Sequence, residues 1–264
     1  MKKLLSMFGT ITALMMILLS AAYAETGDVT ITFWGQAAFK LESGGKTILI
    51  DPWLAPGNWV SPVTVDAITK ADYILVTHDH FDHVGDTIAL SMKTGAIVVA
   101  EYETAKKLIG LGLPPDHVLN GGFGRSIGGA MDIGGISLVM TPAVHSSDSG
   151  VAGGYILTFP GGTTVYHAGD TAIFGDMQLY GSLYPMDIAL LPIGGEFTMD
   201  AIQAAESLRL LRPGKAIPMH YGTFPMLASS ADQFVAQAKK VAPSVGIVVL
   251  TPGQSYILHP KTIQ

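Results

Sequence analysis

The chain has 264 residues, of which 48% are hydrophobic and 14% charged, and its formal net charge is −6. This composition predicts a compact folded protein and excludes an intrinsically disordered one. The negative charge argues against nonspecific attraction to nucleic acid or to an anionic membrane surface. Because the sequence contains no cysteine, a metal site would have to be built from histidine and carboxylate side chains.

The first 24 residues have the pattern of a secretory signal peptide. Two lysines precede an apolar stretch over residues 4–20, and Ala22-Tyr23-Ala24 provides the small residues of a cleavage site. We therefore predict export to the periplasm or the medium, with a mature protein that begins near Glu25 and forms one domain over residues 25–264. A retained membrane anchor is the alternative, which the short and interrupted apolar stretch disfavours.

The rest of the chain mixes patterns of strands with patterns of helices. In the first half, strands are predicted over residues 29–33, 37–41, 47–50, 73–77 and 96–100, and helices over residues 85–93 and 101–108. In the second half, strands are predicted over residues 136–141, 154–159, 163–166, 188–191, 216–219, 246–250 and 255–258, and helices over residues 200–211 and 231–240. The mixture indicates an α/β protein with two packed sheets between helical layers, while the strand order stays open.

The densest group of chemically active side chains directly follows the strand predicted over residues 73–77. It reads Thr77-His78-Asp79-His80-Phe81-Asp82-His83 and holds three imidazoles and two carboxylates. His78 and His80 would share a face only if the backbone there were extended, and Asp82-His83 must then turn back. Since divalent metal ions select clusters of histidine and carboxylate, we interpret this segment as part of a metal site instead of a polar surface loop.

Three more metal-competent side chains, His145, Asp170 and His220, follow other predicted strands. Strands that are aligned the same way deliver their ends to one edge of a sheet, where ligands commonly bind. Each of these residues alone is a weak indication, because a single histidine after a strand is more often a structural group. Their joint pattern predicts one metal centre.

The motif H-x-H-x-D-H, followed by a distant His, Asp and His, resembles the metallo-β-lactamase superfamily. The likeness extends over residues 29–258 and is closest to a branch of metal-dependent hydrolases related to ascorbate-phosphate lactonases and to the phospholipase D that acts on N-acyl-phosphatidylethanolamine. The segments that carry it besides the motif are Ile48-Leu49-Ile50-Asp51-Pro52, Gly121-Gly122, Ala143-Val144-His145-Ser146-Ser147, Tyr166-His167-Ala168-Gly169-Asp170-Thr171, Leu191-Pro192-Ile193-Gly194-Gly195 and Pro218-Met219-His220-Tyr221-Gly222-Thr223-Phe224.

This resemblance implies an αββα four-layer sandwich of two sheets flanked by helices, with two divalent metal ions at one edge. Carried over position by position, one ion would be held by His78, His80 and His145, the other by Asp82, His83 and His220, and Asp170 would bridge the two. Zinc is the first expectation for both ions. Manganese, iron and nickel stay open as alternatives, because they also bind histidine and carboxylate ligands.

The implied chemistry is hydrolysis by a hydroxide that two metal ions activate, with Asp82 as the catalytic residue that orients it and takes or relays a proton. We predict a metal-dependent hydrolase acting on an ester, lactone or phosphoester bond of a small molecule. The alternatives are an iron-dependent redox or sulfur-oxidising enzyme on the same fold and a non-catalytic metal-binding protein. The sequence leaves the substrate and the oligomeric state open.

Other polar residues near the expected ligands receive weaker predictions. Asp51 is expected to hold a metal-bound imidazole by a hydrogen bond, although an Asp-Pro turn would explain it equally well. His167 is expected to play a structural or supporting role instead of binding metal. Glu196 and Tyr221 are candidates for substrate contact, against the commoner roles of solvated and packing side chains. No Lys or Arg occurs between residues 144 and 209, which favours a neutral or singly anionic substrate.

Overall fold

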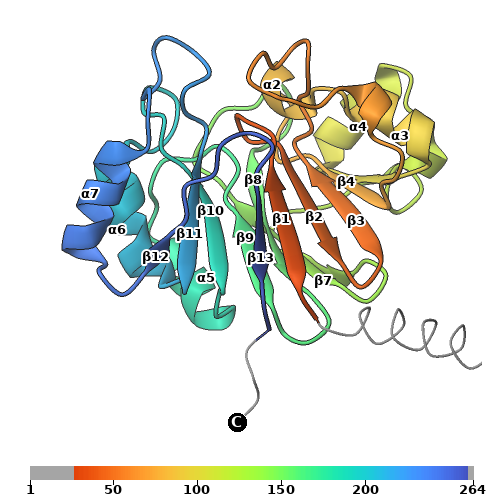
Figure 1. Cartoon of the computed structure of the whole chain (residues 1–264). Helices are drawn as coiled ribbons and strands as arrows, with labels where there is room; N and C mark the ends of the chain where they lie inside the picture. The colour runs from red at the N-terminus through yellow and green to blue at the C-terminus, as the bar shows by residue number, and fades with distance from the viewer. Residues whose placement is uncertain (1–26, 261–264) are drawn as a thin grey trace, which may run out of the picture.

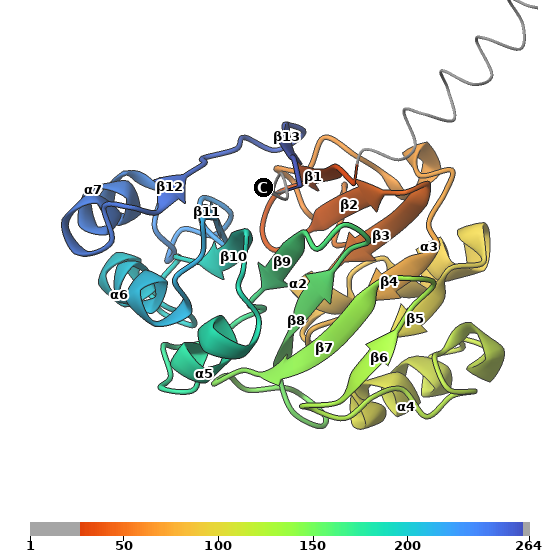
Figure 2. The same cartoon turned by 90° about the horizontal axis from the view of Figure 1, so that it is seen from below.

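Two β-sheets pack face to face, and helices cover the outer side of each (Figures 1 and 2). The computed structural model describes residues 27–260, so the predicted signal peptide lies outside the described residues. One sheet has the strand order β13-β1-β2-β3-β4-β5, and the other has the order β12-β11-β10-β9-β8-β7-β6. The predicted α/β class and the arrangement of two sheets between helical layers are confirmed.

The six-stranded sheet consists of β1 (Val29–Phe33), β2 (Phe39–Ser43), β3 (Lys46–Ile50), β4 (Tyr73–Leu75), β5 (Ile97–Val99) and β13 (Ser255–Leu258). The seven-stranded sheet consists of β6 (Ala130–Asp132), β7 (Ser137–Pro142), β8 (Gly153–Thr158), β9 (Thr164–His167), β10 (Ile188–Pro192), β11 (Lys215–Met219) and β12 (Gly246–Ile247). The helices are η1 (Val65–Ala67), α2 (Phe81–Val84), α3 (Thr87–Thr94), α4 (Tyr102–Gly110), η2 (Pro115–His117), α5 (Met177–Leu183), α6 (Ala201–Leu211) and α7 (Asp232–Val241).

The strands that matter for the site point the same way within each sheet. In the first sheet, β2 is antiparallel to both β1 and β3, so β1 and β3 share a direction, and β4 and β5 continue parallel to β3. In the second sheet, β9, β10, β11 and β12 are parallel, and β8 is antiparallel to both β7 and β9. The carboxyl ends of β1, β3 and β4 therefore meet at one edge, as do those of β7, β9 and β11.

Alternation of side chains along the strands builds the core in layers. Ile188 and Leu190 of β10 point into the core between the two sheets, whereas Ala189 and Leu191 point towards α5, α6 and α7. Strands buried on both faces read as nearly continuous apolar runs, as β10 does. A third apolar cluster lies under α3 and α4 on the outer side of the first sheet.

Helix α6 begins and ends where its sequence predicts. The carboxylate of Asp200 accepts hydrogen bonds from the backbone N–H groups of Ile202 and Gln203, which have no partner within the helix. At the other end, Arg212 adopts a left-handed backbone conformation with φ of 51°, and Pro213 follows. Within residues 27–260, no helix has the length and apolar character needed to cross a membrane.

One buried hydroxyl group ties the two sheets together. The hydroxyl of Tyr155, on β8, lies 2.8 Å from the carbonyl oxygen of Val76 and 3.0 Å from that of Val99, at the ends of β4 and β5. The side chain is fully buried, and burial raises the pKa of Tyr155 well above its ordinary value, so the hydroxyl stays protonated and able to donate. This contact lies directly behind the segment that begins at Thr77.

Candidate metal centre

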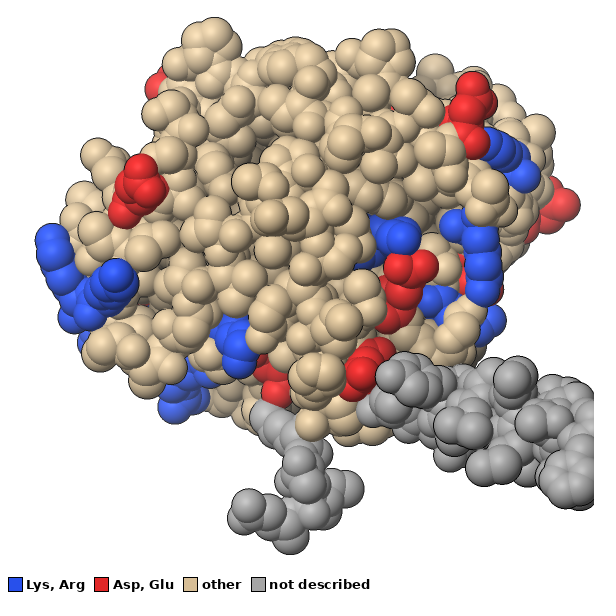
Figure 3. All heavy atoms as spheres, viewed as in Figure 1, with Lys and Arg blue, Asp and Glu red and all other residues tan. Residues whose placement is uncertain are grey.

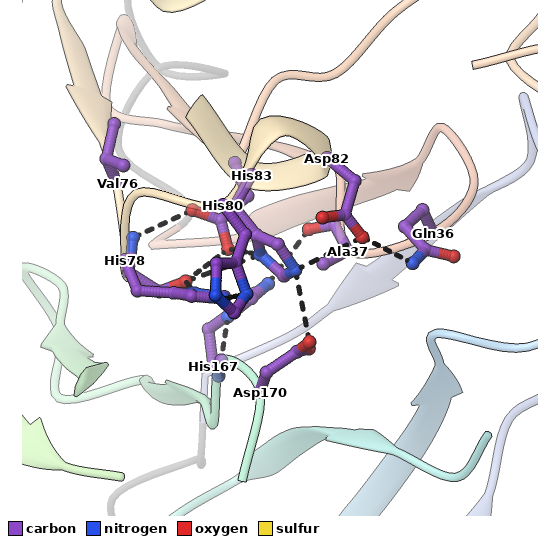
Figure 4. A network of polar contacts seen from close by, with 12 residues as sticks. Gln36, Ala37, Val76, His78, His80, Asp82, His83, His167 and Asp170 are labelled. Carbon is purple, nitrogen blue, oxygen red and sulfur yellow. Dashed lines mark hydrogen bonds and ion pairs between the residues drawn. The ribbon is translucent and has the colours of Figure 1, made fainter. Parts of the chain in front are cut away.

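The predicted metal ligands come together at the edge where the carboxyl ends of six strands lie. Each strand is followed by at least one polar side chain of the site: β1 by Gln36, β3 by Asp51, β4 by the segment from His78 to His83, β7 by His145, β9 by Asp170 and β11 by His220. Figure 4 shows His78, His80, Asp82, His83 and Asp170 lying close together, with the side chain of Gln36 directed towards Asp82. The strand directions thus gather residues that lie far apart in the sequence.

The motif after β4 changes direction in the way its sequence requires. His78 and His80 lie in an extended loop, and the short helix α2 then turns Asp82 and His83 back towards the same point. Gly85 ends α2 with φ of 43°, and a Cβ atom there would lie 2.5 Å from the Cα of Trp53. Only glycine fits this close approach, which fixes where the chain leaves the site.

A first set of ligand atoms is formed by His78, His80 and His145. The Nε2 of His78 lies 2.9 Å from the Nδ1 of His80, and the Nε2 of His145 lies 3.3 Å from the same atom. Ligand nitrogens of a tetrahedral zinc ion are about 3.3 Å apart, given Zn–N distances of about 2.0–2.1 Å. The three imidazoles are therefore spaced as ligands of one ion would be.

A second set is formed by Asp82, His83 and His220, whose ligand atoms lie within 4.8 Å of one another. Asp170 lies between the two sets, because its Oδ2 is 3.0 Å from the Nε2 of His220, 3.3 Å from that of His83 and 3.7 Å from that of His145. The carboxylate thus touches histidines of both sets. This position matches the bridging role that the family resemblance implies for it.

Charge is balanced inside the site between buried carboxylates and imidazoles. Burial alone would raise the pKa of Asp170, but His220 and His83 hold it well below its ordinary value. Conversely, burial alone would lower the pKa of His220, but the carboxylate of Asp170 raises it to about 9. A cation bound here would take over the role of the protons on these histidines, as metal ions do when they displace protons from their ligands.

The first set behaves differently, because the pKa values of two of its imidazoles, those of His78 and His145, are lowered. Burial, followed by the nearby His83, lowers the pKa of His78 to about 2, and burial also lowers the pKa of His145. A neutral imidazole offers a free lone pair, which is the form that binds metal ions. In addition, the buried Oδ1 of Asp170 has no hydrogen-bond partner. A buried polar atom without a partner is costly, and a divalent cation would satisfy it. The donor set therefore fits two divalent ions.

Asp51 fixes the orientation of His83, a member of the second set, by hydrogen bonding. Its carboxylate accepts hydrogen bonds from the backbone N–H and the hydroxyl of Thr77 at 2.8 and 2.7 Å, and it lies 2.8 Å from the Nδ1 of His83. The contact with Nδ1 leaves the Nε2 of His83 directed into the site. Such a hydrogen bond fixes the orientation of a metal-binding imidazole. The positive φ of Asp51, 45°, is unusual for a residue other than glycine and lies next to the site.

Gln36 is part of the site, although its sequence context does not mark it. Its Nε2 donates a hydrogen bond of 2.8 Å to the Oδ2 of Asp82, and its backbone carbonyl accepts one of 2.7 Å from the N–H of His220. The side chain is fully buried. Gln36 therefore positions two members of the second set at once. The only signal for it in the sequence is its place directly after the first strand, because glutamine is not a common metal ligand.

Asp79, the remaining acidic residue of the motif, points away from the metal ligands. Its carboxylate accepts hydrogen bonds from the hydroxyls of Ser147 and Ser149 and from the Nζ of Lys107 at 3.0 Å. Burial alone would raise the pKa of Asp79, but these hydrogen bonds hold it below its ordinary value. The carboxylate thereby ties the loop that carries His78 and His80 to the loop that follows His145.

His167 and the two candidates for substrate contact lie outside the ligand cluster. The Nε2 of His167 is 3.0 Å from the carbonyl oxygen of Ala37, and its Nδ1 accepts a hydrogen bond from the N–H of Gly169. With both nitrogens occupied, His167 supports the turn that leads to Asp170. Glu196 is exposed, Tyr221 packs beside the apolar cluster under α6 and α7, and neither lines the cavity described next.

A cavity of about 460 Å³ opens over the ligand cluster. Five of its lining residues are candidate ligands, namely His80, Asp82, His145, Asp170 and His220. The other lining residues are Phe81, Ser146, Phe197, Phe224 and Met226. A small molecule can therefore reach the ligand atoms from outside, and among the described residues no Lys or Arg side chain lines its path.

Residues 46–221 match the model of the beta-lactamase superfamily domain. The chain belongs to the metallo-β-lactamase superfamily. Among curated proteins of this superfamily, it is 49% identical over 228 residues to a metal-dependent hydrolase of Nitratidesulfovibrio vulgaris, which covers 86% of this chain and 95% of that protein. It is also 43% identical to a metal-dependent hydrolase of Pyrobaculum islandicum, over 85% of this chain and 98% of the relative.

Among solved structures, a metallo hydrolase from the hyperthermophilic archaeon Ignicoccus hospitalis superposes on this metallo-β-lactamase superfamily member with a TM-score of 0.80. The two are 36% identical, and the match covers 89% of this chain and all of the archaeal one. These likenesses confirm the predicted superfamily and show that the chain is a metal-dependent hydrolase.

Replacing Gln36 tests whether it positions the second ligand set. We expect Gln36→Leu to weaken metal binding at that set by about 10–100-fold, because Asp82 loses the hydrogen bond that orients it. Competition with a chromophoric chelator measures the affinity. Gln233→Leu is the matched control, since Gln233 is exposed on α7, and it should bind metal like the unchanged protein. Unchanged affinity of the Gln36 variant would contradict the positioning role.

Proposed function

We propose that this protein hydrolyses an ester, lactone or phosphoester bond of a small molecule with the help of two divalent metal ions, zinc being the first expectation. The observation that carries the proposal is the cavity, because it exposes members of both ligand sets and the carboxylate of Asp170 between them to the same space. A site that only stored metal would have no need of an opening large enough for a substrate.

The two ions, when bound, would lower the pKa of a shared water molecule and polarise the oxygen of the scissile carbonyl or phosphoryl group. The residues of the chain supply the rest. Asp82 lines the cavity and is held by Gln36, so its carboxylate is placed to orient the attacking water and to take up its proton. Asp51 and Asp79 keep the ligand-bearing loops in place by their hydrogen bonds.

Metal analysis tests the proposed pair of ions. Protein reconstituted with zinc should hold two ions per chain, and His78→Ala and His83→Ala should each lose about one of them, because each removes a ligand of a different set. Asp170→Ala should weaken both. His259→Ala is the control, since His259 is exposed and pairs with Asp28 away from the site. Elemental analysis that finds a single ion per chain at saturating zinc would contradict the pair.

Comparing substrates tests the reaction and the charge that the cavity accepts. A substrate with several phosphates normally needs Lys or Arg to balance its charge, and those side chains are absent from the lining given above. We therefore expect kcat/KM on zinc-loaded protein to be higher for a lactone or a monoanionic phosphodiester than for a matched nucleoside triphosphate. A clear preference for the triphosphate would overturn this reading of the cavity, and turnover of none of the three would overturn the proposed reaction.

We also propose that the protein is exported, on the strength of the charged, apolar and small-residue pattern of residues 1–24. Expression of the full chain in a bacterium, followed by mass spectrometry of the periplasmic fraction, measures the start of the mature protein. A first residue at Glu25 is expected. Protein found only in the membrane fraction, with residues 1–24 still attached, would indicate an anchor instead.

A further inference from the structure

Four aromatic side chains pack against one another beside the cavity, and two of them, Phe81 and Phe224, line it. The four are Trp53, Trp59, Phe81 and Phe224, called here the aromatic wall. Trp53 and Phe224 stack with ring centres 5.9 Å apart and 9° between their planes. Trp59 meets Phe224 edge to face at 5.1 Å, and Phe81 meets Trp53 in the same way at 5.7 Å. The rings therefore support one another in fixed orientations.

The structure holds this wall in place although much of it faces solvent. Phe81 is 68% exposed and Trp59 is 58% exposed, whereas Trp53 behind them is buried. Trp53 is anchored by the hydrogen bond of 2.8 Å from its backbone N–H to the carbonyl oxygen of Asp51 and by the close approach of Gly85 to its backbone. The wall is thus built on the same segments that carry Asp51 and the motif from His78 to His83.

Phe197 and Met226 line the same cavity and are more than half exposed. Together with Phe81 and Phe224, they surround the imidazoles and carboxylates at the bottom of the cavity with apolar side chains. In the view of Figure 3, the upper central part of the molecule carries neither Lys nor Arg, and these side chains lie at the sides and below. Large apolar side chains that gather around a cavity mark a binding site, because scattered ones alone would need no explanation.

We infer that the substrate of the proposed hydrolase carries an apolar acyl or aryl group, which binds against Phe81 and Phe224 on one side and Phe197 and Met226 on the other. This inference rests on the proposed function and specifies its substrate class as a carboxylic ester or lactone. In the reaction, the oxygen of water forms a bond to the carbonyl carbon, and the bond from that carbon to the ester oxygen breaks. The leaving alkoxide takes up one proton of the water, and the other proton is released to solvent. An ester gives a carboxylate with an apolar chain and an alcohol, and a lactone gives a single hydroxycarboxylate.

The position of the wall favours a substrate group over a lipid surface or a second copy of the chain. Phe81 stands between His80 and Asp82 in the sequence, and both neighbours line the same cavity as it does. The wall and the candidate ligands therefore form one concave space, in which a group bound to the wall is held next to the ligand atoms. A flat partner would cover the rim of this space without filling it.

A series of 4-nitrophenyl esters with lengthening acyl chains tests the inference on zinc-loaded protein. From acetate to hexanoate we expect kcat/KM to rise roughly two- to fourfold for each added methylene group, because each one moves into apolar surroundings. Phe81→Ala and Phe197→Ala should flatten this rise. Phe123→Ala is the matched control, since Phe123 is 67% exposed and lies outside the cavity lining, and it should keep the full rise.

The two proposals fail in different ways. Equal kcat/KM for 4-nitrophenyl acetate and 4-nitrophenyl hexanoate would overturn the inference of an apolar substrate group and leave the proposed hydrolase activity intact. No turnover of any ester, lactone or phosphodiester would overturn the proposed hydrolase activity itself. A binding experiment adds a readout that needs no turnover. Binding of the free hexanoate ion should quench the tryptophan fluorescence, because Trp53 and Trp59 belong to the wall, and binding of acetate should not. Quenching that survives in both the Phe81 and Phe197 variants would contradict the proposed role of the wall in binding the apolar group.

Other occupants of the wall give their own results. Sedimentation of the protein with vesicles of neutral phospholipid, lost in Phe81→Ala, would point to a lipid surface. A change of mass from dimer to monomer in the same variant, measured by light scattering, would point to a second copy of the chain. Either result together with a flat response to chain length would overturn the inference.

Discussion

The need to balance two buried carboxylates dominates the structure of this protein. Asp82 and Asp170 are buried, and an uncompensated buried charge would be very costly. His83 and His220 face both of them, and two divalent cations would compensate the same charges more completely. The second set of ligands depends on this balance, and so do the residues that orient it, because a carboxylate that turned away would leave a cationic imidazole without its partner.

The fold meets this need through the direction of its strands. Gln36, Asp51 and the motif at His78 come from one sheet, and His145, Asp170 and His220 come from the other. Each sheet alone carries only half of the site. The packed core between them, including the hydroxyl of Tyr155, keeps the two halves in register. The floor of the cavity is therefore built by residues that follow strands of both sheets, whereas its apolar surround is formed by segments that lie outside the sheets.

Much of this could be predicted from the sequence, because the strands are apolar runs and the metal-competent residues directly follow them. Helix α6 was equally predictable, since Asp200 and Pro213 mark its ends. The edge strand β6 and the helix α5 were not predicted. The strand β6 is short and largely exposed, and α5 contains Gly181, which packs against the backbone of Leu211. Gln36 and the aromatic wall were not predicted either. Their roles arise from contacts between distant segments of the chain, and the sequence alone does not show which segments lie next to each other.

The spacing of the ligands along the chain has a consequence for how the protein would acquire its metal ions. His145 lies far from His78 in the sequence, and His220 lies far from Asp82, so an unfolded chain brings together only the ligands of the motif from His78 to His83. Cations that bind only the folded state stabilise it by a free energy that rises with the logarithm of their concentration. They would also act as crosslinks between distant segments. The lifetime of the folded protein against proteolysis would then depend on the supply of metal ions in its compartment.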